Sequence, residues 1–427
     1  MTVPADVLEH RQRRLAQGVA TRIADALAVP PPPESGDDRS PGSPRWLGQS
    51  LSKGAAGIAV LHGVRARAGL GSWERVHAWL ACATREDLSA GAGAGLWFGA
   101  PAVAFALSAA APPGQYRRAA QALDTAVTRL VRVRLDAASA RMAAARRPSL
   151  AEFDLVRGLT GLGAYLLHCD PHGEMLRQIL AYLVRLTEPL PAGDPAGLSA
   201  PGWWTSDVPS GRPAGAFSGG CADLGMAHGI AGPLALMALS ARQGISAGGQ
   251  AAAIDRICRW LDAWRQDGPA GPWWPERISL TELRVGQPAH RGPARPSWCY
   301  GTPGLARAQH LAGQATGDCA RQQMAEHALA SCLSDPAQLA RFTDPALCHG
   351  LAGLIVTACH GAADARSPDI GASLPHLLDT LLGDAGQRDS PSLRLPGLIE
   401  GSAGIALTLH SMATGTKSGL GTCLLIG

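Results

Sequence analysis

A short glycine motif heads an apolar run in residues 224–236, which read LGMAHGIAGPLAL. The glycines of this G-x-x-G motif are Gly229 and Gly232, and the Leu234 and Met237 that follow have the spacing of one helical face. Glycine has no Cβ, so it permits close approach of neighbouring backbones where a loop enters a helix. The segment therefore predicts a tight loop that leads into a buried helix.

The same motif, again followed by an apolar run, recurs along the whole chain. The first glycines of successive copies lie 45 to 72 residues apart, which is room for two helices with their loops. The second copy is degenerate, because Ala102 stands in place of its second glycine. The seven copies begin at Gly54, Gly99, Gly158, Gly229, Gly301, Gly350 and Gly401.

Seven helix pairs can stack as an open solenoid or close into a ring of inner and outer helices. Closure is favoured, because the first and seventh copies are as apolar as the middle ones and show no polar capping face. Strand-like alternation is scarce, so the fold class is all-α. In a closed ring, the residues just before each motif gather at one end, beside positive helix N-termini, and chemistry is expected there.

Composition sets broad limits on the function. The 427 residues are 46% hydrophobic, with 38 basic against 34 acidic side chains, and this describes a globular protein with a formal charge of +4. No basic run is interleaved with aromatic residues, so nucleic acid is not an expected partner. The uncharged stretch Gly91–Pro113 is interrupted by Pro101, which favours a buried helix over a membrane span.

Two regions stand apart from the repeat. We expect residues 1–50 to form an N-terminal helix and a Pro-rich lead-in, and residues 51–427 to form a single seven-repeat domain. No signal peptide is evident in residues 1–14, so a cytoplasmic location is expected. The long loop Leu190–Gly225 contains Trp203-Trp204 and either covers the pocket as a wall or lid or is an ordinary packed loop.

Residues that bind metals stand before two consecutive motifs. Cys299 precedes the fifth motif, and Cys348-His349 precedes the sixth, 49 residues after Cys299. An isolated Cys-His pair is more often unrelated to metal, but matching positions in adjacent repeats favour zinc, which takes two thiolates and an imidazole when its fourth position is left for substrate. His228, before the fourth motif, would on its own more often be a satisfied core histidine, and a capping role is also open to Asp154 and Glu400.

Several segments resemble the lanthionine synthetase C-like family, the cyclases of lanthipeptide biosynthesis. The W-C-Y-G box at 298–301 and the C-H-G box at 348–350 are the most specific, and the likeness extends to 50–62, 153–167 and 399–407. The resemblance implies an α/α toroid, a double-layered barrel of seven inner and seven outer helices. It also implies a stand-alone cyclase that works with a separate dehydratase.

The resemblance further implies roles for individual residues. Cys299, Cys348 and His349 are expected to hold Zn²⁺. His228 and Asp154 are expected to be acid/base groups, with Arg295 and Tyr300 lining the site. In the resulting hypothesis, a cysteine thiolate adds to dehydroalanine or dehydrobutyrine, His228 protonates the enolate, and Asp154 accepts the thiol proton or orients His228.

The expected substrate is a dehydrated precursor peptide with its leader, and the expected partners are a dehydratase and an exporter, within a complex at the membrane. Two alternatives stay open. In one, the protein is a peptide-binding scaffold in which zinc is structural, so that removal of zinc unfolds it. In the other, a cyclase-like enzyme adds glutathione to dehydrated residues.

Overall fold

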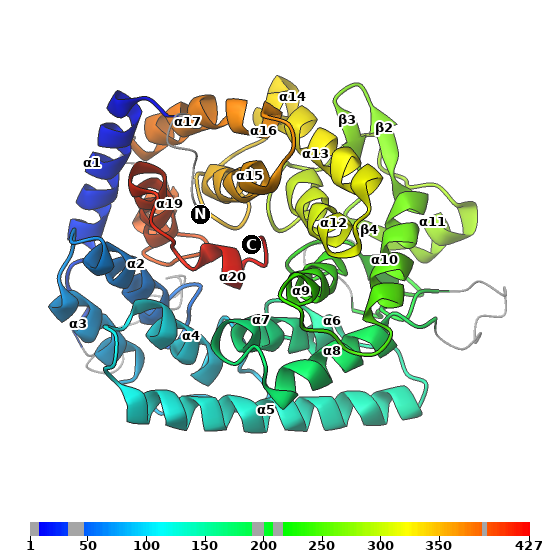
Figure 1. The fold of residues 1–427 in the computed structure, drawn as a ribbon, viewed down its shortest axis with the longest axis horizontal. Coiled ribbons are helices and arrows are strands. Elements are labelled where there is room, and N and C mark those ends of the chain that lie inside the picture. Colours follow the sequence, from blue (N-terminus) through cyan, green and yellow to red (C-terminus); the bar gives the residue numbers. More distant parts are fainter. Residues whose placement is uncertain (1–7, 33–46, 190–199, 208–216, 387–390) are drawn as a thin grey trace.

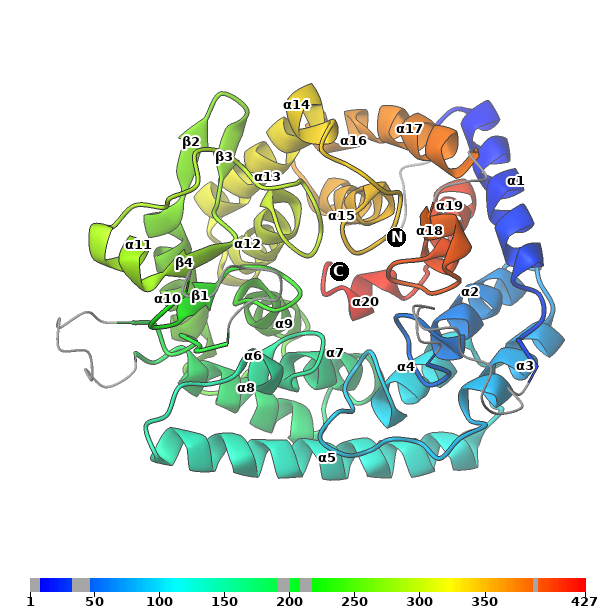
Figure 2. The ribbon, with the colours of Figure 1, turned by 180° about the vertical axis from the view of Figure 1, so that it is seen from behind.

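The chain folds into a ring of helices in two concentric layers, which Figures 1 and 2 show from its two ends. The computed structural model describes residues 8–32, 47–189, 200–207, 217–386 and 391–427. The predicted all-α, double-layered ring is confirmed. Most of the Pro-rich lead-in and much of the loop 190–225 lie outside the described residues.

Among the described residues, the inner layer contains seven helices, and each begins just after the first glycine of a repeat. Because these helices touch neighbours on every side, they are apolar around their circumference, and in Ala55–Arg67 every residue but the last is buried. The helices are α2 (Ala55–Arg67), α4 (Ala100–Ala110), α7 (Leu159–Cys169), α9 (Ala231–Arg242), α12 (Thr302–Thr316), α15 (Leu351–Asp364) and α19 (Ser402–Thr414).

The outer layer is amphipathic, with an apolar stripe toward the inner helices. In Glu174–Leu186, buried Leu176, Ile179, Leu180 and Leu183 recur at helical spacing, and each buried leucine contributes about 1.5–3 kcal/mol. The outer helices are α3 (Trp73–Ala83), α5 (Arg117–Ala143), α8 (Glu174–Leu186), α10 (Gln250–Trp264), α13 (Cys319–Ser334), α17 (Leu374–Gly386) and α1 (His10–Ala26).

The ring closes where the two ends of the chain meet. Each inner helix packs against the next, and α19 packs against α2. The N-terminal helix α1 covers α19 and also contacts α17, so it completes the outer layer (Figure 1). The short α20 (Leu420–Cys423) lies near the middle of the ring and contacts α7 and α15.

In the repeats that keep the second glycine of the motif, this glycine lets the inner helix pack closely against the loop before it. A Cβ at Gly353 would lie 1.9 Å from the carbonyl oxygen of Leu347, and one at Gly304 would lie 2.0 Å from that of Trp298. Both distances are far shorter than any van der Waals contact, so a side chain there would push the helix off its loop. This close approach is the physical reason for the repeat.

Short elements occupy the connections. Strand β1 (Cys221–Asp223) pairs antiparallel with β4 (Arg277–Ser279), which sets Asp223 opposite Arg277. Strands β2 (Gln266–Gly268) and β3 (Gly271–Trp273) form a hairpin. The remaining short helices are α6 (Leu150–Phe153), α11 (Leu280–Val285), α14 (Pro336–Leu339), α16 (Asp369–Ala372) and α18 (Pro391–Arg394).

The apolar stretch Gly91–Pro113 forms a loop followed by the buried helix α4, as predicted. Among the described residues, no helix combines the length and the hydropathy that a membrane crossing requires.

Candidate active site

The loops before the inner helices form a rim at one end of the ring. Backbone hydrogen bonds join neighbouring loops, so residues distant in sequence lie side by side: the Met226 N–H donates to the Cys299 carbonyl at 2.9 Å, and the Cys299 N–H donates to the Cys348 carbonyl at 3.3 Å. Four more such bonds run from Leu155 to Ala227 (3.1 Å), Cys348 to Ile399 (2.8 Å), Ile399 to Ser52 (3.1 Å) and Leu51 to Trp97 (3.1 Å). The predicted convergence of these loops is confirmed.

Two predicted zinc ligands, Cys299 and Cys348, meet on this rim. A hydrogen bond from Cys348, with a further one from Ser297, lowers the pKa of the buried Cys299 thiol to about 7. The Ser297 Oγ lies 3.6 Å from the Cys299 Sγ. The same bond to Cys299, together with burial, raises the pKa of Cys348 well above its usual value. Cys299 is therefore the sulfur that ionises first.

His349 is oriented by Asp344. The His349 Nδ1 lies 2.8 Å from the Asp344 Oδ2, and because a carboxylate accepts, Nδ1 carries the proton and Nε2 bears the lone pair. This hydrogen bond raises the pKa of His349, although burial opposes it. Burial alone would raise the pKa of Asp344, but hydrogen bonds from His349 and the Ala346 N–H lower it.

The donor set on this rim fits zinc. Within the described ranges, no three or more His, Cys, Asp or Glu side chains already surround a position for an ion. Cys299 and Cys348 are nevertheless in hydrogen-bond contact, and one ionises near neutral pH. His349 has a free Nε2 lone pair, and a carboxylate on the other ring nitrogen is the usual partner of a zinc-bound histidine. Cys299, Cys348 and His349 stay a predicted ligand set.

Arg295 lies beside the sulfur pair. Its charge helps to lower the pKa of Cys299, after the hydrogen bonds from Cys348 and Ser297. The Arg295 Nε is buried and has no hydrogen-bond partner among the described residues. A buried donor without a partner is costly, so this N–H lacks an acceptor that a bound group could supply.

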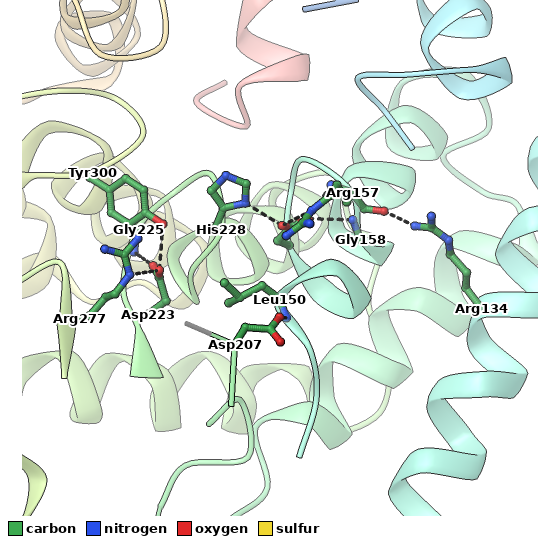
Figure 3. A network of polar contacts seen from close by, with 11 residues as sticks. Arg134, Leu150, Arg157, Gly158, Asp207, Asp223, Gly225, His228, Arg277 and Tyr300 are labelled. Carbon is green, nitrogen blue, oxygen red and sulfur yellow. Dashed lines mark hydrogen bonds and ion pairs between the residues drawn. The ribbon is translucent and has the colours of Figure 1, made fainter. Parts of the chain in front are cut away.

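Asp154 and His228 form a hydrogen-bonded pair, although they are 74 residues apart in the chain. The His228 Nδ1 lies 2.7 Å from the Asp154 Oδ2, while the other carboxylate oxygen accepts from the N–H groups of Arg157 at 2.5 Å and Gly158 at 2.8 Å (Figure 3). The Asp154 side chain has no exposed surface, whereas that of His228 is 33% exposed. The carboxylate therefore fixes the ring through Nδ1 and leaves Nε2 without a partner among the described residues.

Tyr300 is held by a network beneath the rim. Its hydroxyl donates to the Asp223 Oδ2 at 2.8 Å, and the Arg277 Nε donates to the same oxygen at 2.8 Å (Figure 3). The Arg277 guanidinium lies 4.5 Å from the centre of the Tyr300 ring. Burial and the charge of Asp223 raise the pKa of Tyr300. The Tyr300 and His228 ring centres are 6.4 Å apart, so the two rings lie near each other while the Tyr300 hydroxyl is engaged in this network.

Two carboxylates of the site, Asp223 and Asp344, were not expected from the sequence. Each stands six positions before the first glycine of its repeat. Each uses Oδ1 to accept the N–H two residues later, at 2.9 Å, which leaves Oδ2 for an aromatic partner, Tyr300 or His349. Aligning the repeats on their glycines would have placed both aspartates, and Arg295, in the same register.

Other residues of interest have structural roles. Glu400 forms a partly exposed ion pair with Lys53 at 3.0 Å, which joins the seventh loop to the first. Trp203 and Trp204 are fully buried in the core, which favours the packed alternative for their part of the loop. Burial raises the pKa of Cys221, in β1, to about 12.

Comparison with known proteins places this chain among known helical rings. A family model described as lanthionine synthetase C-like protein matches residues 45–425. The nisin biosynthesis protein NisC of Lactococcus lactis subsp. lactis is 24% identical over 207 residues, which are 48% of each chain. The aligned part thus spans about half the length of that relative.

The fold has a solved counterpart. A structure of nisin cyclase superposes with a TM-score of 0.72 over 98% of each chain, at 16% sequence identity. At this identity the likeness shows a shared fold, and it agrees with the predicted toroid.

Proposed function

The chain belongs to the lanthionine synthetase C-like family, and on that premise we propose that it is a cyclase that forms thioether rings within a dehydrated precursor peptide. A substrate cysteine sulfur would bond to the β-carbon of dehydroalanine or dehydrobutyrine, the Cα–Cβ π bond would break, and a proton would reach the α-carbon. The observation that carries the proposal is the shared rim: the Met226–Cys299 hydrogen bond sets the Asp154–His228 loops beside the thiol pair.

We propose that Cys299, Cys348 and His349 hold zinc. When bound, zinc makes a coordinated substrate thiol a thiolate at neutral pH. The support is the donor set: a cysteine whose pKa falls to about 7, a second sulfur in contact with it, and an imidazole oriented by Asp344.

His228 is the proposed proton donor to the α-carbon. The Asp154 Oδ2 accepts from Nδ1, so Nε2 is left on the partly exposed side of the ring, where it could hand a proton to a substrate. The Asp154 carboxylate accepts three hydrogen bonds from N–H groups, forms an ion pair with the Arg157 Nε at 3.7 Å, and is fully buried. Of the two roles considered for Asp154, orientation of His228 is therefore favoured over capture of the thiol proton.

Arg295 is the proposed stabiliser of the enolate oxygen, because its buried Nε has no partner among the described residues. Tyr300 would shape the pocket wall through its ring, since its hydroxyl is engaged by Asp223. We further propose a leader-bearing precursor as substrate, and a dehydratase and an exporter as partners in a complex at the membrane.

The deciding experiment incubates the purified protein with a dehydrated precursor and then alkylates the remaining thiols for mass spectrometry. Cyclisation leaves the mass unchanged and removes alkylatable thiols. Cys299→Ala should lose both zinc and ring formation. Cys221→Ala is the matched control, because that buried cysteine lies outside the thiol pair, and it should retain both.

The same assay separates the alternatives. A Cys299→Ala protein that binds one zinc and consumes substrate thiols would refute the ligand assignment. Loss of helicity on chelation, with no ring formation by the zinc-loaded protein, would indicate a scaffold. Supplying glutathione in equal amount tests the third possibility, because only its adduct increases the peptide mass.

A further inference from the structure

We use seam for the line along which two neighbouring loops of the rim meet, and one seam differs from the others. Between the second and third repeats, the described loops 91–98 and 154–158 share no backbone hydrogen bond, whereas every other pair of neighbouring loops does. Gly95 and Phe98 direct their N–H groups to each other's carbonyl oxygens, at 2.9 and 3.0 Å, so neither donor is left for the next loop. The loops nevertheless touch, since a Cβ at Gly95 would lie 3.1 Å from the Arg157 carbonyl oxygen.

A side chain from the outer layer bridges this seam. Arg134 of α5 donates through Nη1 to the carbonyl oxygen of Arg157, and through Nη2 to those of Ala92, at 3.0 Å, and Ala94. The planar guanidinium presents several donors in a fixed fork, so one residue can bind carbonyls on two loops at once. The Arg134 guanidinium therefore joins loops 91–98 and 154–158, which no backbone hydrogen bond connects.

The bridged loop carries Asp154. The Arg157–Gly158 peptide accepts from Arg134 through its carbonyl oxygen and donates its N–H, that of Gly158, to the Asp154 Oδ1 at 2.8 Å; the Asp154 Oδ2 accepts from His228 at 2.7 Å (Figure 3). On its other side the loop is fastened by the Leu155 N–H, which donates to the Ala227 carbonyl at 3.1 Å. Arg134 is thus three polar contacts away from the His228 ring.

We propose that Arg134 is a positioning residue for ring closure: it closes the seam between the second and third repeats and so holds Asp154 and His228 in their working geometry. This inference rests on the proposed cyclase function. Arg134 acts through the Arg157 peptide and does not touch substrate.

The expected effect is local. Without Arg134, three carbonyl oxygens lose their donor, and loop 154–158 is held only by its hydrogen bonds to Ala227 and His228 of the next loop. The Asp154–His228 pair is then expected to shift relative to the bound peptide. A misplacement of about 1 Å in a catalytic group lowers the rate by about 100-fold. The loops of Cys299 and Cys348 are fastened by other backbone bonds, so zinc binding should not change.

The test compares Arg134→Gln with Arg132→Gln, an exposed arginine on the same helix. Amide hydrogen exchange followed by mass spectrometry reports on loops 91–98 and 154–158, zinc is counted per chain, and kcat and KM are measured for ring closure. Arg134→Gln should exchange faster in those two loops alone, keep one zinc, and lose about 10- to 100-fold in kcat with little change in KM. Arg132→Gln should match the wild type.

A conservative variant distinguishes a local effect of Arg134 from a general folding defect. Arg134→Lys keeps the charge but not the fork, so it should fall between the wild type and Arg134→Gln in both exchange and kcat. Unchanged exchange in the two loops of a folded Arg134→Gln protein would overturn the inference, as would a wild-type kcat. If the wild-type protein itself closes no rings, the proposed function fails, while hydrogen exchange still decides whether Arg134 fastens the seam.

Discussion

Replacement of Asp154 by asparagine is the sharpest test of the acid/base pair. The exchange is isosteric, and the asparagine oxygen can still accept from the N–H groups of Arg157 and Gly158, so the loop should keep its shape. What is lost is the negative charge 2.7 Å from the His228 Nδ1, in a position with no solvent exposure. The amide also turns a donor toward that nitrogen, which disfavours the tautomer with its proton on Nδ1.

The expected magnitude follows from this one contact. A hydrogen bond to a charged group contributes about 1.5–3 kcal/mol, and about 1.4 kcal/mol corresponds to a tenfold change in rate. Asp154→Asn should therefore lower kcat for ring closure by about 10- to 150-fold, with zinc content and helicity unchanged. The assay is the initial rate at which alkylatable thiols disappear from a saturating dehydrated precursor.

Asp207→Asn is the control, because Asp207 caps the nearby helix α6 through the Leu150 N–H at 2.7 Å and makes no contact with His228. It should keep the wild-type rate. If Asp154→Asn closed rings as fast as the wild-type protein, the assignment of Asp154 as the orienting carboxylate would be wrong.

Three further changes address other parts of the molecule. Asp344→Asn should weaken zinc binding about 10- to 100-fold in competition with a chelator, because it removes the carboxylate that orients His349, and an unchanged affinity would contradict that role. Tyr300→Phe should cost about 1–2 kcal/mol in free energy of unfolding by removing the hydrogen bond to Asp223, and should change kcat by less than about threefold. A much larger loss of kcat would place the hydroxyl in the chemistry. Burial lowers the pKa of His62 to about 4, so between pH 6.5 and 4 the unfolded chain binds a proton that the folded chain does not, and stability falls as the pH drops. His62→Gln should make this dependence shallower by up to about 1.4 kcal/mol per pH unit in urea unfolding, and an identical slope in both proteins would refute the reasoning.

The local sequence determined the elements of the fold. Recurring G-x-x-G motifs followed by apolar runs predict inner helices, because glycine spacing and helical periodicity are properties of neighbouring residues. The matching positions of Cys299 and Cys348-His349 before adjacent motifs placed the candidate ligands in the same way. Since Cys299 and Cys348 are one repeat apart, their contact follows directly once the ring closes.

Only the tertiary structure decided which polar partners meet across that ring. Asp154 reaches His228 from 74 positions away, and strand pairing sets Asp223 opposite Arg277, where Asp223 also accepts the hydrogen bond from the Tyr300 hydroxyl. The hydrogen bonds of Arg134 to loops 91–98 and 154–158 could not be predicted from the sequence, because the sequence of α5 has the pattern of an ordinary amphipathic helix. Such contacts depend on how the layers pack, and no local pattern of residues encodes the distance between two loops of a closed ring.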